Sequence, residues 1–273
     1  MVSQEQRRRQ LAREKFLRQQ QRRTSARRRT HTRNAVIAAV VGVVVAGGAT
    51  AYATGVFESD GKKANAGAGA TPSATPTSKA PDPCEKPAEG KVKSLTWKKE
   101  PAVTIDKSAA YTMKMATTCG DIGIALKASA APHTVNSFDF LAGKGYFDHT
   151  KCHRLTTNGI YVLQCGDPTA QGSGGPGYTI PDENLKDKTL KGNVYPAGTI
   201  AMANTGQKHT GGSQFFLVYQ DSQLPPSYTP FGTISQSGMT VLKKIAAAGE
   251  NTGQGDGAPN ATVVVNKLTV TKS

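Results

Sequence analysis

The sequence predicts a mainly β domain, a barrel or a sandwich with two helices, that follows a single N-terminal transmembrane helix. Many short stretches alternate apolar and polar residues, which is typical of strands. Only two stretches repeat apolar residues at helical spacing, and glycine is frequent, with 29 residues among 273. A long uncharged run near the N-terminus predicts the membrane helix.

Residues 1–34 form a basic tail. The first 33 residues hold twelve arginines and lysines but only two acids, Glu5 and Glu14, so about +10 of the formal net charge of +15 lies there. Basic clusters of this kind indicate binding to nucleic acid when no apolar segment lies next to them. Here an apolar segment follows directly, a pattern that keeps the basic side in the cytoplasm. We therefore expect the tail to lie against anionic lipid headgroups. Binding to nucleic acid is a weaker alternative, and we do not expect it.

Residues 35–57 are 23 residues without a charge, rich in valine and alanine. At 1.5 Å per residue, such a helix crosses the ~30 Å of hydrocarbon in a bilayer. The length of the apolar run and of its basic flank favours an uncleaved signal anchor. A removed signal peptide is the alternative, because Ala51-Tyr52-Ala53 resembles a processing site. The domain that follows is expected outside the cytoplasm, held on a single-pass anchor or secreted after cleavage.

Residues 58–88 consist mainly of glycine, alanine, proline, serine, threonine and lysine. Such a stretch does not bury enough apolar surface to offset the entropy cost of ordering it. We expect a flexible linker between the membrane and a folded domain.

The cysteines agree with this topology, because all four follow the apolar segment: Cys84, Cys119, Cys152 and Cys165. An even number of cysteines in an oxidising compartment predicts two disulfides with three connectivities. We prefer Cys152 with Cys165, which we expect on neighbouring strands, and this pairing leaves Cys84 for Cys119. Free buried thiols are the alternative.

A lead-in at residues 89–106 precedes the main domain at 107–273. Within the lead-in, Lys93–Trp97 and Ala102–Ile105 alternate enough to predict short strands. The main domain then begins with a predicted hairpin over residues 111–126, turning at Thr118-Cys119-Gly120-Asp121.

Two helices are predicted from capping and periodicity. The first begins near Pro132, is capped by Thr134 and ends near Gly143. The second ends at Gly249 and has apolar residues at helical spacing, namely Met239, Leu242, Ile245 and Ala246. Further strands are expected at residues 198–202, 214–219 and 262–271.

Three familiar kinds of site are not predicted. His149, Cys152, His153 and Cys165 are close in sequence but lack the short paired spacing of structural zinc sites, so no metal is expected. The glycine-rich stretch at 172–177 contains Pro176, which forbids the helix that a dinucleotide site needs. Ser213 lacks the second glycine of a nucleophile elbow.

Several motifs occur together in an order that resembles the cyclophilin-type peptidyl-prolyl cis/trans isomerases. These motifs are His153-Arg154, Gln164-x-Gly166-Asp167-Pro168, Gly174–Tyr178, Asp182-Glu183, Ala201–Asn204, Gly212–Phe216 and Phe231-Gly232. The resemblance covers about residues 107–273. It implies an eight-stranded antiparallel β-barrel closed by two helices, with isomerase activity on proline-containing polypeptides.

The resemblance also implies roles for individual residues. Arg154 corresponds to the catalytic arginine of the family, and Gln164 and Asn204 complete the predicted catalytic set. The implied substrate-binding residues are Tyr161, Val162, Ala203, Gln214, Phe216, Leu224 and Tyr228. The chain departs from the family pattern by two extra residues between Arg154 and Gln164, and by Gln223 where many members have the tryptophan that favours cyclosporin binding.

The expected chemistry follows from the peptide bond. An X-Pro bond rotates slowly, over a barrier of ~18–20 kcal/mol, because resonance makes it partly double. A guanidinium that donates to the proline amide favours the twisted, pyramidal nitrogen, while an apolar pocket holds the ring. No proton moves and no cofactor is expected. The sequence therefore predicts an isomerase that helps exported proteins fold, and a proline-peptide-binding scaffold with little or no turnover is the alternative.

Overall fold

The computed structural model describes residues 81–272. The predicted basic tail, the predicted transmembrane segment and the linker up to residue 80 lie outside the described residues. Among the residues that are described, no helix combines the length and apolar character needed to cross a bilayer.

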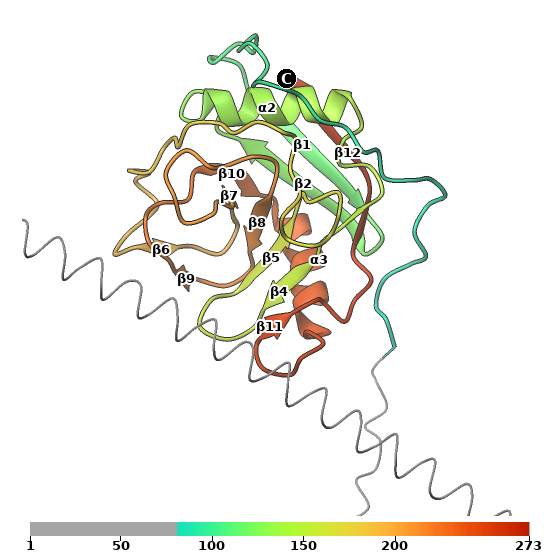
Figure 1. Cartoon of the computed structure of the whole chain (residues 1–273). Helices are drawn as coiled ribbons and strands as arrows, with labels where there is room; N and C mark the ends of the chain where they lie inside the picture. The colour runs from blue at the N-terminus through green and yellow to red at the C-terminus, as the bar shows by residue number, and fades with distance from the viewer. Residues whose placement is uncertain (1–80, 273) are drawn as a thin grey trace, which may run out of the picture. The chain divides into compact units, whose positions relative to one another are not determined.

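One curled antiparallel sheet of ten strands forms the centre of the domain, in the order β11-β4-β5-β8-β7-β10-β2-β1-β12-β3 (Figure 1). A separate two-stranded ribbon joins β6 and β9. The strands are β1 (Tyr111–Thr117), β2 (Gly120–Leu126), β3 (Thr150–Lys151), β4 (Arg154–Thr156), β5 (Val162–Cys165), β6 (Val194–Tyr195), β7 (Thr199–Met202), β8 (Phe215–Val218), β9 (Ser222–Gln223), β10 (Pro230–Ile234), β11 (Asp256–Gly257) and β12 (Val264–Lys272).

The predicted mainly β class is confirmed, but the strand count differs from the expected eight. Two-residue strands at both ends of the sheet, β11 and β3, extend it to ten. The order of pairing runs from β11 to β3 without a ladder between these two ends, so the described sheet is curled rather than closed by hydrogen bonds. Strand twist accumulates across many strands, and the sheet wraps around one apolar core.

The predicted hairpin is present as β1 and β2, which pair from Tyr111 with Leu126 to Thr117 with Gly120. Alternate side chains of β1 point into the core, where Met113 and Met115 are fully buried. Long-range pairing then places β12 beside β1, from Lys272 opposite Tyr111 onward. The first and last strands of the domain therefore lie side by side.

Both predicted helices are present, as α2 (Pro132–Gly143) and α3 (Gln236–Ala247). Helix α3 is capped by the Ser235 side chain, which accepts from the Gly238 backbone N–H. Thr134 does not cap α2, and this prediction was wrong. Instead, the Glu183 carboxylate accepts from the backbone N–H groups of His133 and Thr134 and from the Thr134 hydroxyl. The negative carboxylate satisfies the free donors at the helix start from a loop far away in the sequence.

The lead-in does not form the short strands predicted at Lys93–Trp97 and Ala102–Ile105. It runs as irregular chain beside β12 and over α2 (Figure 1). The Trp97 ring packs edge-on against Phe140 of α2, and the backbone N–H of Trp97 donates to the carbonyl of Pro176. The Asn136 side chain of α2 accepts from the Thr104 N–H. Because the lead-in finds its partners on a helix and a loop, its apolar alternation produces no ladder.

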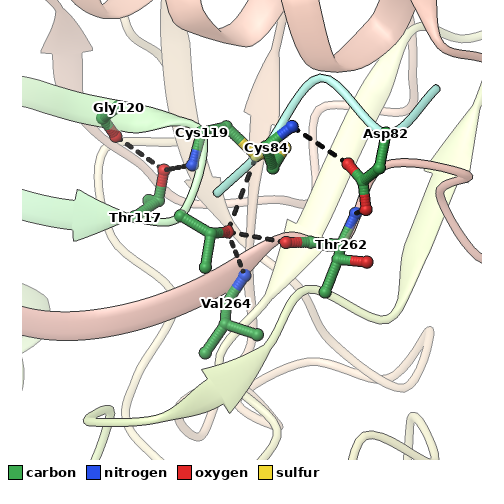
Figure 2. The surroundings of a disulfide bond; sticks show 8 residues. Asp82, Cys84, Thr117, Cys119, Gly120, Thr262 and Val264 are labelled. Carbon is green, nitrogen blue, oxygen red and sulfur yellow. Dashed lines mark hydrogen bonds between the residues drawn. A yellow bond between two sulfur atoms is a disulfide. The ribbon is translucent and has the colours of Figure 1, made fainter. Parts of the chain in front are cut away.

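Two disulfides are formed, with the pairing that the sequence analysis prefers, Cys84 with Cys119 and Cys152 with Cys165. Figure 2 shows how the first fastens Cys84, near the end of the predicted linker, to the β1–β2 turn. Nearby, the Asp82 carboxylate accepts from the N–H groups of Cys84 and Thr262. Part of the stretch predicted as linker is therefore attached to the domain.

Candidate active site

The candidate site lies on the outer face of the central strands β5, β7 and β8. Residues alternate between the two faces of a strand. Leu163, Phe215 and Leu217 point into the main core, whereas a second, separate apolar cluster occupies the other face. This outer cluster consists of the buried residues Val162, Tyr195, Ala201, Phe216 and Val218.

A cavity of about 560 Å³ opens over the outer cluster. Eight of the ten predicted catalytic and substrate-binding residues line it: Arg154, Gln164, Asn204, Val162, Ala203, Phe216, Leu224 and Tyr228. The wall is therefore half apolar, with polar groups on one side.

Arg154 opens β4 directly opposite Gln164 on β5. It is the only arginine after Arg33; the other basic residues of the domain are lysines and histidines. Its Nη1 donates to Gln164 Oε1 at 3.2 Å, Gln164 Nε2 donates to Gln214 Oε1 at 2.9 Å, and Gln214 Nε2 donates to the carbonyl of Gly174 at 2.9 Å. This chain of bonds crosses from one strand to the next and orders the polar wall.

The other edge of the guanidinium faces an acid that the sequence analysis did not identify. Arg154 Nε and Nη2 donate to the two carboxylate oxygens of Asp256, each at 2.7 Å. Hydrogen bonding to Arg154 lowers the pKa of Asp256, and the same bonds raise the pKa of Arg154. The Asp256 side chain is 55% exposed, so Arg154 stays at the cavity and is not drawn inward to a buried carboxylate.

His153 precedes Arg154 and also lines the cavity. Both of its ring nitrogens are shielded from solvent and lack a hydrogen-bond partner among the described residues. Burial lowers the pKa of His153, with an opposing contribution from Asp167. The imidazole is therefore neutral near pH 7 and adds no second cation beside the guanidinium.

The apolar floor is held by aromatic contacts and one buried hydroxyl. The rings of Phe216 and Tyr228 meet edge-on with centroids 5.4 Å apart. Beneath them, the Tyr195 hydroxyl donates to the carbonyl of Tyr228 at 2.8 Å and accepts from its N–H at 3.2 Å. Tyr195 is fully buried, and this burial raises its pKa to about 12. It fixes the segment that carries Tyr228 over the cavity.

Some predicted residues take other positions. Tyr161 does not line the cavity; its ring pairs with that of Tyr219, because alternation along the strand turns Val162 to the outer face and Tyr161 away from it. Ile160, in the hairpin between β4 and β5, lines the cavity instead. Gln214 borders an adjoining cavity of about 650 Å³ and reaches the first one only through Gln164.

Asn204 borders both cavities, but its side chain is engaged within the protein. Its Nδ2 donates to the carbonyl of Ser227, and its Oδ1 accepts from the Gly206 N–H. The Asn204 side chain therefore shapes the rim between the two cavities.

Asp256, Tyr195 and Ile160 are among the residues of the site that were not predicted from the sequence. No local pattern marks Asp256, which is 102 residues from Arg154 in the chain. The extra residues between Arg154 and Gln164 were the one available signal for Ile160.

A curled β sheet with a half-apolar cavity on its outer face, and a single arginine at the rim of that cavity, are the features that define this domain. Comparison with known proteins identifies the class of this domain. The sequence model of the family "Cyclophilin type peptidyl-prolyl cis-trans isomerase/CLD" matches residues 112–270. The chain belongs to this family, which confirms the resemblance found in its motifs.

Curated relatives agree. The chain is 48% identical over 198 residues to the probable peptidyl-prolyl cis-trans isomerase B of Mycobacterium leprae, covering 70% of this chain and 63% of the relative. It is 47% identical over 168 residues to the protein of that name from Mycobacterium tuberculosis, covering 59% of this chain and 54% of the relative. The matched region thus spans less than two thirds of either relative.

A solved structure gives the same fold. The cyclophilin-type peptidyl-prolyl cis-trans isomerase of Cryptosporidium parvum superposes with a TM-score of 0.50 at 25% identity, covering 60% of this chain and 99% of that protein.

Proposed function

We propose that the protein is a peptidyl-prolyl cis/trans isomerase whose substrates are X-Pro bonds of polypeptides. The observation that carries this proposal is the position of Arg154 at the rim of an apolar cavity floored by Phe216, Val162 and Leu224. The two relatives named as isomerases support it.

The geometry assigns complementary tasks to the two parts of the site. The cavity accepts the pyrrolidine ring, because burying an apolar ring stabilises the complex by roughly 25 cal/mol per Å². A guanidinium has five N–H donors, of which three bind Asp256 and Gln164, so two are left for a substrate. Donation to the proline amide stabilises the pyramidal nitrogen of the twisted bond more than the planar one. Each tenfold in rate needs ~1.4 kcal/mol of this preference.

Binding without turnover is the second candidate, because Asp256 already occupies one edge of the guanidinium. The test compares the isomerisation rate of a short Ala-Pro peptide, followed by NMR exchange, for the wild type, Arg154→Ala and Arg154→Lys. We expect kcat/KM to fall about a hundredfold in Arg154→Ala, and most of this loss to persist in Arg154→Lys because lysine lacks the planar fork.

A matched control is Lys272→Ala, which removes another half-exposed cation from an ion pair, that with Asp106. It should leave the rate unchanged. A wild type that binds the peptide without accelerating its isomerisation would establish the scaffold function instead.

We further propose that the domain acts on exported proteins from the outer side of the membrane, held by residues 35–57 with the basic tail in the cytoplasm. The uncharged segment and its basic flank support this orientation. The two disulfides support an oxidising compartment. Protease added to intact cells should digest the domain and spare the tail; a protected domain would contradict the orientation.

A further inference from the structure

The strongest contact of the Arg154 side chain is with Asp256, a residue outside the family's motifs noted above. The carboxylate binds the Nε and Nη2 edge through two parallel bonds of 2.7 Å, and Gln164 binds Nη1 from the other side. A planar group held on two sides has one orientation of its plane. Its two remaining N–H groups lie on the two Nη nitrogens.

The loop that carries Asp256 is built into the fold. Asp256 and Gly257 form β11, which pairs with Thr156 and Leu155 of β4, next to Arg154 in the sheet. The Glu250 carboxylate, which is buried, braces the turn before β11 by accepting from the N–H groups of Thr252 and Gly255. The carboxylate of Asp256 is thus placed by the backbone.

The β4–β5 hairpin provides the surface on which this loop rests. The Thr157 N–H donates to the carbonyl of Gly255 at 2.9 Å. A side chain at Gly255 would place its Cβ 2.5 Å from the Cβ of Asn158, and the φ of Gly255 is +90°, so only glycine fits there without strain. This hairpin lies between Arg154 and Gln164, where the motifs predict two extra residues relative to the family. The predicted difference in spacing and the position of Asp256 therefore belong to one local arrangement.

Two effects of Asp256 on catalysis oppose each other. Its negative charge weakens the field of the guanidinium at the cavity, and its two bonds restrict the Arg154 side chain. With side-chain exposures of 38% and 55%, water screens the charge effect strongly. Water does not weaken the restriction of the Arg154 side chain. An arginine without this restriction would lose much side-chain entropy on reaching the transition state. Orientation should therefore outweigh attenuation.

We propose that Asp256 is a positioning residue for the isomerase reaction, which orients Arg154 toward the proline amide; this proposal rests on the proposed function. Asp256 touches the arginine and acts on the substrate through it. Its effect should fall on kcat more than on KM, since the oriented donor binds the twisted amide more strongly than the planar one.

A double-mutant cycle on the full chain tests this role, with an Ala-Pro peptide as substrate. Asp256→Asn keeps the size of the side chain and removes the charge that holds both nitrogens. We expect about a tenfold fall in kcat/KM, mostly in kcat, and partial recovery in Asp256→Glu. In the Arg154→Ala background, Asp256→Asn should change the rate less than twofold, because the residue through which it acts is gone.

Asp121→Asn is the matched control, since Asp121 also forms a 2.7 Å ion pair, with Lys114, and is 58% exposed. It should leave the rate unchanged, and thermal unfolding of each variant identifies any loss of fold. An unchanged or faster Asp256→Asn enzyme, or an equal fall in both Arg154 backgrounds, would overturn the positioning role. If the wild type itself is inactive, the proposed function fails; if the wild type is active and only Asp256→Asn has no effect, the positioning role alone fails.

Discussion

The two faces of the central strands are covered in different ways. Phe215 and Phe216 are neighbours on β8 and are both buried, with exposures of 0% and 5%. Phe215 packs among the rings of Phe138 and Phe147 inside the curled sheet. Phe216 contacts Tyr195 and Tyr228, and its remaining surface borders the cavity.

Within the single strand β8, we therefore expect the inner face to contribute to stability and the outer face to contribute to ligand binding. The inner face is filled by side chains, so removing atoms there leaves a void. The outer face ends at a cavity that is already open to solvent, so removing atoms there enlarges it without a new void. Three substitutions test the contrast, from the largest expected effect to the smallest.

Phe215→Ala should destabilise the domain by about 3–5 kcal/mol, because it loses the burial of the apolar ring and also leaves a void in the core. Denaturant unfolding measures the change. The peptide affinity of the fraction that remains folded should equal that of the wild type. Unaltered stability would show that the inner face is not the core of the domain.

Phe216→Ala should lower the free energy of unfolding by about 1.5–3 kcal/mol, because only the contribution from burying the apolar ring is lost. It should also weaken binding of an Ala-Pro peptide at least tenfold, which calorimetric titration measures. If Phe216→Ala were as destabilising as Phe215→Ala and left binding intact, the outer cluster would be ordinary core.

Tyr195→Phe should cost about 1 kcal/mol at pH 8, since it removes the hydrogen bond to the carbonyl of Tyr228. Burial raises the pKa of Tyr195 from 10.0 to about 12, so between these values the unfolded chain has lost a proton that the folded protein keeps. Wild-type stability contributed by Tyr195 is therefore present below pH 10 and is lost as pH rises through 12, by about 1.4 kcal/mol per unit. This loss exceeds the ~1 kcal/mol contributed by the hydrogen bond, so in unfolding experiments at several pH values the stability advantage of the wild type over Tyr195→Phe should shrink above pH 10 and reverse before pH 12. A constant difference would show that the pKa of Tyr195 is the same in the folded and unfolded protein.

Local patterns predicted the regular elements well. The alternation at residues 111–126 predicted β1 and β2, and helical periodicity predicted α2 and α3. These signals are local because a strand or a helix repeats over a few residues. The same patterns failed in the lead-in, where Trp97 packs on Phe140 instead of pairing with a strand.

The site was predicted in part. The family's motifs placed Arg154, Gln164 and Phe216 around one cavity, as the structure has them. Tyr161 was predicted there as well, but in the structure Val162 lines the cavity and the Tyr161 ring packs against Tyr219.

The sequence by itself determined a mainly β domain of the cyclophilin family, the positions of its helices and the residue pattern of its pocket, because these depend on short-range periodicity and on motifs. Only the tertiary structure decided that Glu183 caps α2 and that Asp256 binds Arg154. Charges attract through space, and an ion pair that joins residues 102 positions apart imposes no spacing on the chain between them.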